Sequence, residues 1–182
     1  GWYCDVADKC AGVNYTMPAV CPMGYYCPNG TRHATEYGCP AGTFGNRTGL
    51  GGVGECEPCT AGMYGGMSGL SAPSGPCSAT YYCRGGAVVG TPVDGVTGAV
   101  CPAGHYCPAG SAAPVGCPVG TYVVGNGSGS VVDCVACDVG QYCETYGLSA
   151  PTAACFEGRV CGNGTVYPTQ VCPAGFYCPR GV

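Results

Sequence analysis

The chain has 182 residues, a net charge of −4 and a single lysine, Lys9, so it offers no basic stripe for nucleic acid. No isoleucine and only three leucines and three phenylalanines are present, too few for a conventional aliphatic core. No apolar run approaches the roughly 20 residues that a membrane-spanning helix needs.

The cysteine content replaces the missing core. Nineteen cysteines, about one residue in ten, predict a disulfide scaffold in which each cross-link contributes on the order of 2–4 kcal/mol. Glycine and proline make up 51 residues, a fraction that without such cross-links would be typical of disorder. Disulfides form and persist in oxidising compartments, so the composition predicts a secreted or cell-surface protein.

One short motif recurs along the chain. It consists of a cysteine, often a following proline, a glycine at the third position after the cysteine and an aromatic residue at the fifth. Proline fixes φ and glycine permits positive φ, which predicts a tight turn with the ring packed over a disulfide. In chain order the copies are CPMGYYC at Cys21, CPAGTFG at Cys39, CTAGMYG at Cys59, CPAGHYC at Cys101, CPVGTYV at Cys117, CDVGQYC at Cys137 and CPAGFYC at Cys172. The segment CSATYYC at Cys77 keeps the ring and loses the glycine.

The spacing of these copies predicts the fold class. Most begin roughly 16–24 residues apart, which is too short for helical repeats and suits two-stranded, disulfide-closed units. We therefore expect a small disulfide-rich fold, mostly irregular with short β-hairpins and little or no helix. Units that contact mainly their neighbours are expected to form an elongated tandem array.

Two longer periods lie above the short motif. Five cysteines reappear 78 residues later, from Cys39, Cys56, Cys59, Cys77 and Cys83 to Cys117, Cys134, Cys137, Cys155 and Cys161. Four others, Cys4, Cys10, Cys21 and Cys27, reappear 151 residues later as Cys155, Cys161, Cys172 and Cys178. These periods predict divisions into residues 1–38, 39–116, 117–154 and 155–182, the last re-entering the pattern of residues 4–31. A chain of this kind is expected to continue end to end into a filament.

The runs CPAGTFGNRTGLGGVGECEPCTAGMY and CPVGTYVVGNGSGSVVDCVACDVGQY resemble the ephrin-receptor-like and TNF-receptor-like cysteine-rich repeats. The signature of those repeats is C-P-x-G-x-[YF], a loop and then C-x-x-C. The copies with a second cysteine after the tyrosine resemble repeats in large surface glycoproteins of algae and other protists, including mastigoneme proteins. The resemblance covers nearly the whole chain, and it implies a fold more than a function.

The same resemblance implies a disulfide pairing. It would join Cys39 to Cys56 and Cys117 to Cys134; Cys137 could then close on Cys143, which leaves Cys59 unpaired because Gly65 stands where Cys143 stands. A competing scheme leaves Cys77 unpaired instead, and the sequence does not choose between the two. Its pairs are Cys10–Cys21, Cys27–Cys39, Cys83–Cys101, Cys107–Cys117, Cys143–Cys155 and Cys161–Cys172.

A search for reaction chemistry favours structural explanations. The motifs CEPC at Cys56 and CVAC at Cys134 lie 78 residues apart, with only His33 and His105 to complete a zinc site. A thioredoxin-like site would need a βαβ context, which is absent from the sequence. Glu55 and Glu57 flank Cys56 in an expected loop rather than in a pocket. We expect no enzyme activity, no metal site and no cofactor.

Five N-x-[ST] sequons are present, at Asn14, Asn29, Asn46, Asn126 and Asn163. In a secreted chain most are expected to carry glycans, which would also keep a surface of few charges soluble. The leading hypothesis is therefore a glycosylated structural segment of an extracellular fibre or cell-surface coat. The alternative is a ligand-binding ectodomain, for which the Trp2–Tyr3 pair is the candidate contact.

Overall fold

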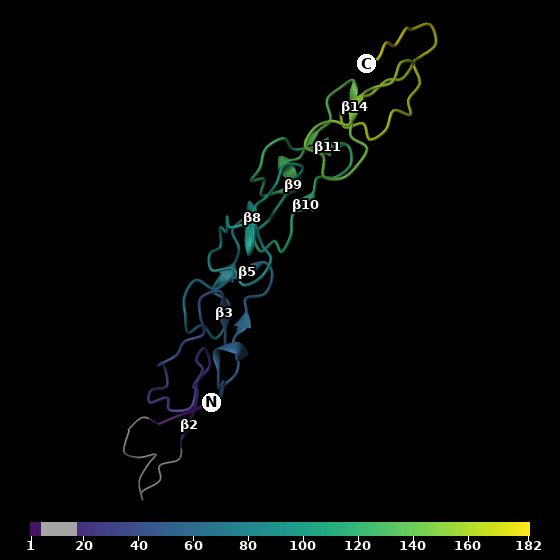
Figure 1. Ribbon diagram of the computed structural model, residues 1–182. Helices are drawn as coiled ribbons and strands as arrows, with labels where there is room; N and C mark the ends of the chain where they lie inside the picture. Colours follow the sequence, from purple (N-terminus) through teal and green to yellow (C-terminus); the bar gives the residue numbers. More distant parts are fainter. Residues whose placement is uncertain (5–17) are drawn as a thin grey trace, which may run out of the picture. The chain divides into compact units, whose positions relative to one another are not determined.

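The computed structural model describes residues 1–4 and 18–182, and these residues contain no α-helix. They form seven two-stranded sheets and two single-turn 3₁₀ helices, η1 (Val53–Glu55) and η2 (Val131–Asp133). The paired strands, labelled in part in Figure 1, are β1 (Trp2–Tyr3) with β2 (Ala19–Val20), β3 (Thr43–Phe44) with β4 (Glu57–Pro58), β5 (Met63–Tyr64) with β6 (Gly75–Pro76), β7 (Tyr81–Cys83) with β8 (Gly98–Val100), β9 (His105–Tyr106) with β10 (Val115–Gly116), β11 (Thr121–Tyr122) with β12 (Val135–Ala136), and β13 (Gln141–Tyr142) with β14 (Ala153–Ala154). The predicted small, disulfide-rich, hairpin-based fold is confirmed.

The cysteine motif decides where the strands lie. We use this name for each seven-residue segment that begins at Cys21, Cys39, Cys59, Cys77, Cys101, Cys117, Cys137, Cys155 or Cys172. The fifth and sixth residues of a motif typically form a strand, which pairs antiparallel with the two residues before the next motif. In one such pair, His105 lies opposite Gly116 and Tyr106 opposite Val115. The alternation of turn and ring in the sequence therefore becomes a short hairpin at six of the nine motifs.

A backbone ladder joins successive motifs. The residue at the fourth motif position, normally glycine, accepts a hydrogen bond from the first N–H of the next motif and donates its own N–H to that motif's seventh residue. At Gly104, the carbonyl accepts from Cys117 and the N–H donates to Val123, both at 2.9 Å. Within the described residues the same two bonds occur at eight successive steps, with lengths of 2.7–2.9 Å. Because these donors and acceptors are backbone groups, the ladder tolerates different side chains at each step.

Close backbone approach explains why the fourth motif position favours glycine. Gly24, Gly104 and Gly140 have φ between +81° and +84°, a region that residues with a β-carbon adopt at a cost. A β-carbon at Gly104 would also overlap the carbonyl oxygen of Gly147, which lies two motifs further along the chain. The motif at Cys101 is therefore packed against its second neighbour as well as its first.

The 78-residue period of the cysteines is also a period of structure. Strands β3, β4, β5 and β6 recur 78 residues later as β11, β12, β13 and β14, and η1 recurs as η2. A carboxylate closes the turn in both helical loops: Glu55 accepts from the Gly51 N–H at 2.8 Å, and Asp133 accepts from the Gly129 N–H at 2.8 Å. The equivalent positions therefore keep the acidic side chain that satisfies the loop backbone.

The N-terminal residues enter the ladder in the middle of a motif. Gly1 to Cys4 read GWYC and take the places of motif residues four to seven, as GFYC does at residues 175–178. The carbonyl of Gly1 accepts from Cys21, and the N–H of Cys4 donates to Thr31. Cys161 donates to Val182 in the same way, so Cys4 has the hydrogen-bond register of Cys161 and not of Cys155. The 151-residue period, which relates Cys4 to Cys155, therefore does not relate residues with equivalent ladder bonds at the N-terminal residues.

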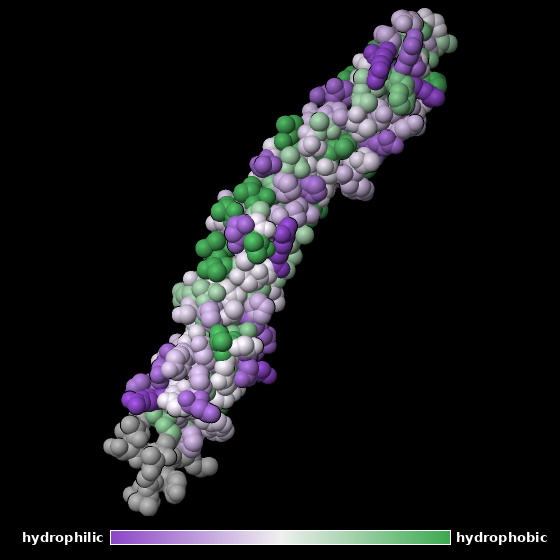
Figure 2. Space-filling model, viewed as in Figure 1, coloured by the Kyte–Doolittle hydropathy of each residue, from purple (hydrophilic) through white to green (hydrophobic). Residues whose placement is uncertain are grey.

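The core consists mainly of sulfur. Of the 19 buried apolar residues in the described part of the chain, 14 are cysteines. The others are Phe44, Leu50, Tyr82, Ala87 and Tyr142. Many valines are exposed instead, and apolar and polar side chains are mixed on the face shown in Figure 2. Disulfides therefore hold the interior that aliphatic side chains hold in ordinary domains.

The chain divides into two compact units, one formed by Gly1–Cys77 and Cys83–Ala99 and the other by Ser78–Tyr82 and Val100–Val182. The divisions suggested by the sequence periods, before residues 39, 117 and 155, fall inside these units. At each of those three cysteines the ladder continues, because its N–H donates to the preceding motif at 2.7–2.9 Å.

One motif departs from the glycine rule and allows a test of it. Thr80 has φ +75°, the only positive φ of a residue other than glycine in the described chain. The ladder holds it there, since Thr80 donates to Cys107 at 2.9 Å and accepts from Cys101 at 2.8 Å. A branched side chain in this region is strained, so Thr80→Gly is expected to stabilise the fold by about 1 kcal/mol. The measurement is the midpoint of thermal or urea unfolding with the disulfides intact.

The matched control for Thr80→Gly is Gly104→Ala, at the same position of the next motif. Its methyl group would overlap the carbonyl oxygen of Gly147, so the unfolding midpoint should fall. Equal midpoints for Thr80→Gly and the unaltered chain would show that positive φ at this position carries no strain.

Candidate functional site

Most of the described cysteines lie in disulfides and not in open sites. The structure joins Cys39 to Cys56 and Cys117 to Cys134 across 17 residues, and it joins Cys137 to Cys143. In each C-x-x-C segment the first cysteine is bonded to a cysteine earlier in the chain, so the two cysteines of a segment are not bonded to each other. Among the described residues, no group of three or more metal-ligating side chains is gathered in one place.

Six cross-links close a motif on itself. Each joins the first and seventh residues of a motif, with Cα atoms 5.8–6.3 Å apart, and the segment CPAGHYC is one of them. The pairs are Cys21–Cys27, Cys77–Cys83, Cys101–Cys107, Cys137–Cys143, Cys155–Cys161 and Cys172–Cys178. The alternative scheme that would pair Cys27 with Cys39 is not formed, and Cys77 is bonded rather than unpaired. Cys4 is also disulfide-bonded.

Cys59 is the free cysteine of the described chain, and it is buried. Its motif has Gly65 where other motifs have the second cysteine, and a β-carbon at Gly65 would lie 2.7 Å from the Cys59 sulfur. Burial raises the pKa of the Cys59 thiol. The thiolate is the reactive form, so this cysteine has the environment of an inert structural thiol.

Four of the five sequon asparagines are exposed: Asn29, Asn46, Asn126 and Asn163. Asn14 lies outside the described residues. The Asn126 side-chain oxygen accepts the Ala103 N–H at 2.8 Å, so its amide nitrogen is left for a glycan. Asn46 instead donates through its amide nitrogen to Glu57 at 3.3 Å, an exposed contact that a glycan would alter.

Asn29 and Asn163 occupy the same kind of turn. The Thr31 N–H and hydroxyl both donate to the Pro28 carbonyl, at 3.2 and 2.6 Å. Thr165 makes the equivalent two bonds to the Gly162 carbonyl, at 3.3 and 2.8 Å. The glycine after each asparagine has positive φ, +90° at Gly30 and +73° at Gly164, as the third residue of such a turn requires. Each turn therefore presents its asparagine at an exposed tip.

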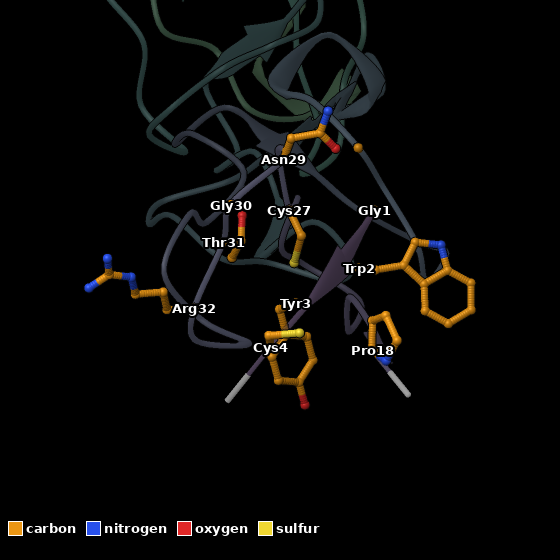
Figure 3. A pocket seen from close by; sticks show the side chains of 11 residues that line it. Gly1, Trp2, Tyr3, Cys4, Pro18, Cys27, Asn29, Gly30, Thr31 and Arg32 are labelled. Carbon is orange, nitrogen blue, oxygen red and sulfur yellow. The ribbon is translucent and has the colours of Figure 1, made fainter. Parts of the chain in front are cut away.

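A cleft of about 500 Å³ lies beside the first of these turns. It is lined by β1, by Pro18, which precedes β2, and by the turn at Asn29, Thr31 and Arg32. Figure 3 shows the Trp2 indole and the Asn29 carboxamide at the cleft, with Arg32 extending away from Trp2. Trp2 is 58% exposed, and both Trp2 and Tyr3 line this cleft, a concave neighbourhood that the sequence did not reveal.

The carboxylates with altered acidity are engaged in local turns. The Thr97 hydroxyl donates to Asp94 at 2.7 Å and, together with backbone N–H groups, lowers the pKa of that carboxyl. The Arg32 N–H donates to Glu36 at 2.9 Å and lowers its pKa in the same way. These two acids act as acceptors for exposed loop backbone.

None of the described segments forms a helix that could cross a membrane. Comparison of the chain with protein-family models and with curated proteins gives no match.

Proposed function

We propose that the chain is a structural segment of a secreted, N-glycosylated, disulfide-stapled fibre or cell-surface coat that assembles end to end. The observation that carries the proposal is the ladder, in which eight successive steps use the same two backbone bonds although the side chains differ. A structure built by adding equivalent steps is suited to mechanical extension. The resemblance to repeats of large surface glycoproteins, including mastigoneme proteins, agrees with this function.

The last motif supplies the means of continuation. In the eight earlier steps, the fourth residue of a motif donates to and accepts from the next motif. Neither backbone group of Gly175 makes such a bond within the described chain, and Phe176 and Tyr177 are 75% and 80% exposed. A further cysteine motif, in the same chain or in a second one, would pair these groups and cover the two rings. Between two chains such a contact would be heterologous, and it would propagate into a filament when its rotation does not close a ring.

Disulfide content supports the location. Eight cross-links join described cysteines, and such density fits an extracellular protein. Glycans at exposed asparagines would coat the fibre and limit proteolysis. Under this proposal the chain has no enzymatic role and needs no cofactor.

Electron microscopy of native material tests the proposal. We expect filaments with a regular axial repeat, because each added unit meets its neighbour with the same geometry. Discrete particles at all concentrations, or dimers with two-fold symmetry, would contradict end-to-end assembly. Replacing Gly175 by alanine gives a further check, because glycine at this position accommodates positive φ, here +88°, and the variant should form fewer or shorter filaments.

A ligand-binding ectodomain is the second candidate, favoured by the cleft at Trp2. Aromatic side chains with a few polar groups around a concave surface are typical of small-ligand sites. Binding of a soluble ligand by unassembled protein, with quenching of Trp2 fluorescence, would support this candidate over the structural one.

A further inference from the structure

We propose that the cleft at Trp2 holds the first sugars of an N-linked glycan attached to Asn29 of the same chain. The inference rests on the proposed function in one respect, since it requires that the chain be N-glycosylated. It adds that one glycan binds to its own chain and that this glycan occupies the cleft.

The attachment point of the glycan, Asn29, lies at the cleft. Asn29 lines the cleft and lies at the tip of a turn that the Thr31 bonds to Pro28 hold in place. Thr31 is 4% exposed, so the base of the turn is anchored in the interior. A sugar on Asn29 therefore begins at the wall of the cleft, and it binds there at a high effective concentration because it is tethered.

The residues that line the cleft are chemically suited to contact a sugar ring. A pyranose ring has an apolar face of C–H groups and a polar rim of hydroxyl groups. Trp2, Tyr3 and Pro18 supply aromatic and apolar surface, while Asn29 and Arg32 bring polar groups to the same cleft. The volume of about 500 Å³ lies within the ~300–1,000 Å³ of typical small-ligand pockets. Covering the exposed indole with a sugar face removes apolar surface from water.

A second sequon provides a matched comparison. Asn163 has the same sequence, N-G-T, and the same turn with positive φ at its glycine. It does not line the cleft. A glycan on Asn163 is therefore expected to extend into solvent, and the two sites should differ although their turns are alike.

The single tryptophan of the sequence makes the contact measurable. Glycoprotein from a secreting eukaryotic host would be compared with Asn29→Gln and Asn163→Gln by acrylamide quenching of Trp2 fluorescence. We expect Asn29→Gln to raise the quenching constant about twofold, because a sugar on one face of the indole covers about half of its exposed area. We expect Asn163→Gln to leave it unchanged. Under native conditions, a glycosidase should release the Asn29 glycan more slowly than the Asn163 glycan.

Glycopeptide mass spectrometry on the same samples separates the outcomes. A bare Asn29 alongside occupied sites elsewhere would overturn this proposal and leave the glycosylated fibre intact. An occupied Asn29 with equal quenching in all three proteins would also overturn it. All sequons bare would contradict both the inference and the glycosylation in the proposed function. If Asn29→Gln is poorly secreted, enzymatic removal of all N-glycans from the unaltered glycoprotein and from Asn163→Gln should raise both quenching constants to the same value.

Discussion

Reduction of the disulfides without denaturant is expected to unfold the chain. Cysteines make up 14 of the 19 buried apolar residues of the described part, so little apolar surface remains to hold the fold together. Loops of 6 and 17 residues each constrain the unfolded chain by about 2–3 kcal/mol. Loss of a few of these disulfide contributions is comparable to the ~5–15 kcal/mol by which ordinary domains are stable, and loss of all of them exceeds it.

Near-ultraviolet circular dichroism and resistance to protease, with and without reductant, measure this effect. Both should be lost together as the cross-links open. The control is the same chain treated with alkylating reagent alone, which should keep both properties. Protection that survives complete reduction would reveal a second source of stability, independent of sulfur.

Gly65→Cys is expected to add a cross-link with Cys59 and to stabilise the fold by about 2 kcal/mol. A β-carbon at residue 65 lies 2.7 Å from the Cys59 sulfur, so a sulfur attached to it is within reach of the ~2.05 Å bond. Its backbone already makes the bonds of a motif cysteine, with the N–H donating to Ala87 and the carbonyl accepting from Gly42. Leu70, whose Cδ1 is 3.2 Å from the new β-carbon, must shift slightly.

Counting free thiols and comparing unfolding midpoints measures the result. The unaltered chain exposes one more thiol than Gly65→Cys when both are denatured without reductant. Gly45→Cys is the matched control at the same motif position, because its β-carbon would crowd the Leu50 Cδ1 at 2.9 Å while Cys39 is already bonded to Cys56. That variant should gain a thiol and lose stability. A free Cys59 in Gly65→Cys would show that the two motif positions do not meet.

Much of the fold follows from local sequence rules. The glycine at the fourth motif position predicts a turn, and Gly104 has the positive φ that such turns use. The 78-residue period of the cysteines recurs in the strands and in η1 and η2, because equal spacing of turn and cross-link residues produces equal hairpins.

Other parts depend on contacts that a motif does not encode. The segment CFEGRVC at Cys155 has Val160 in place of an aromatic residue at the sixth motif position, yet it enters the ladder through Gly158, because the ladder is made by backbone groups and not by rings. Disulfide partners were ambiguous, since neighbouring cysteines in either scheme are separated by short loops. The cleft could not be foreseen, because residues distant in the sequence line it together, from β1 and from the turn at Asn29.

The backbone bonds of the ladder do not depend on the length of the loop between two motifs. Successive motif cysteines are 16 residues apart from Cys101 to Cys117 and 24 apart from Cys77 to Cys101. Both steps nevertheless close with the same pair of backbone bonds, at 2.8–2.9 Å. Insertions between the ladder positions thus change only what the surface displays. A lineage carrying such repeats can diversify its loops, in sugar sites or in exposed valines, while the two backbone bonds of each step stay the same.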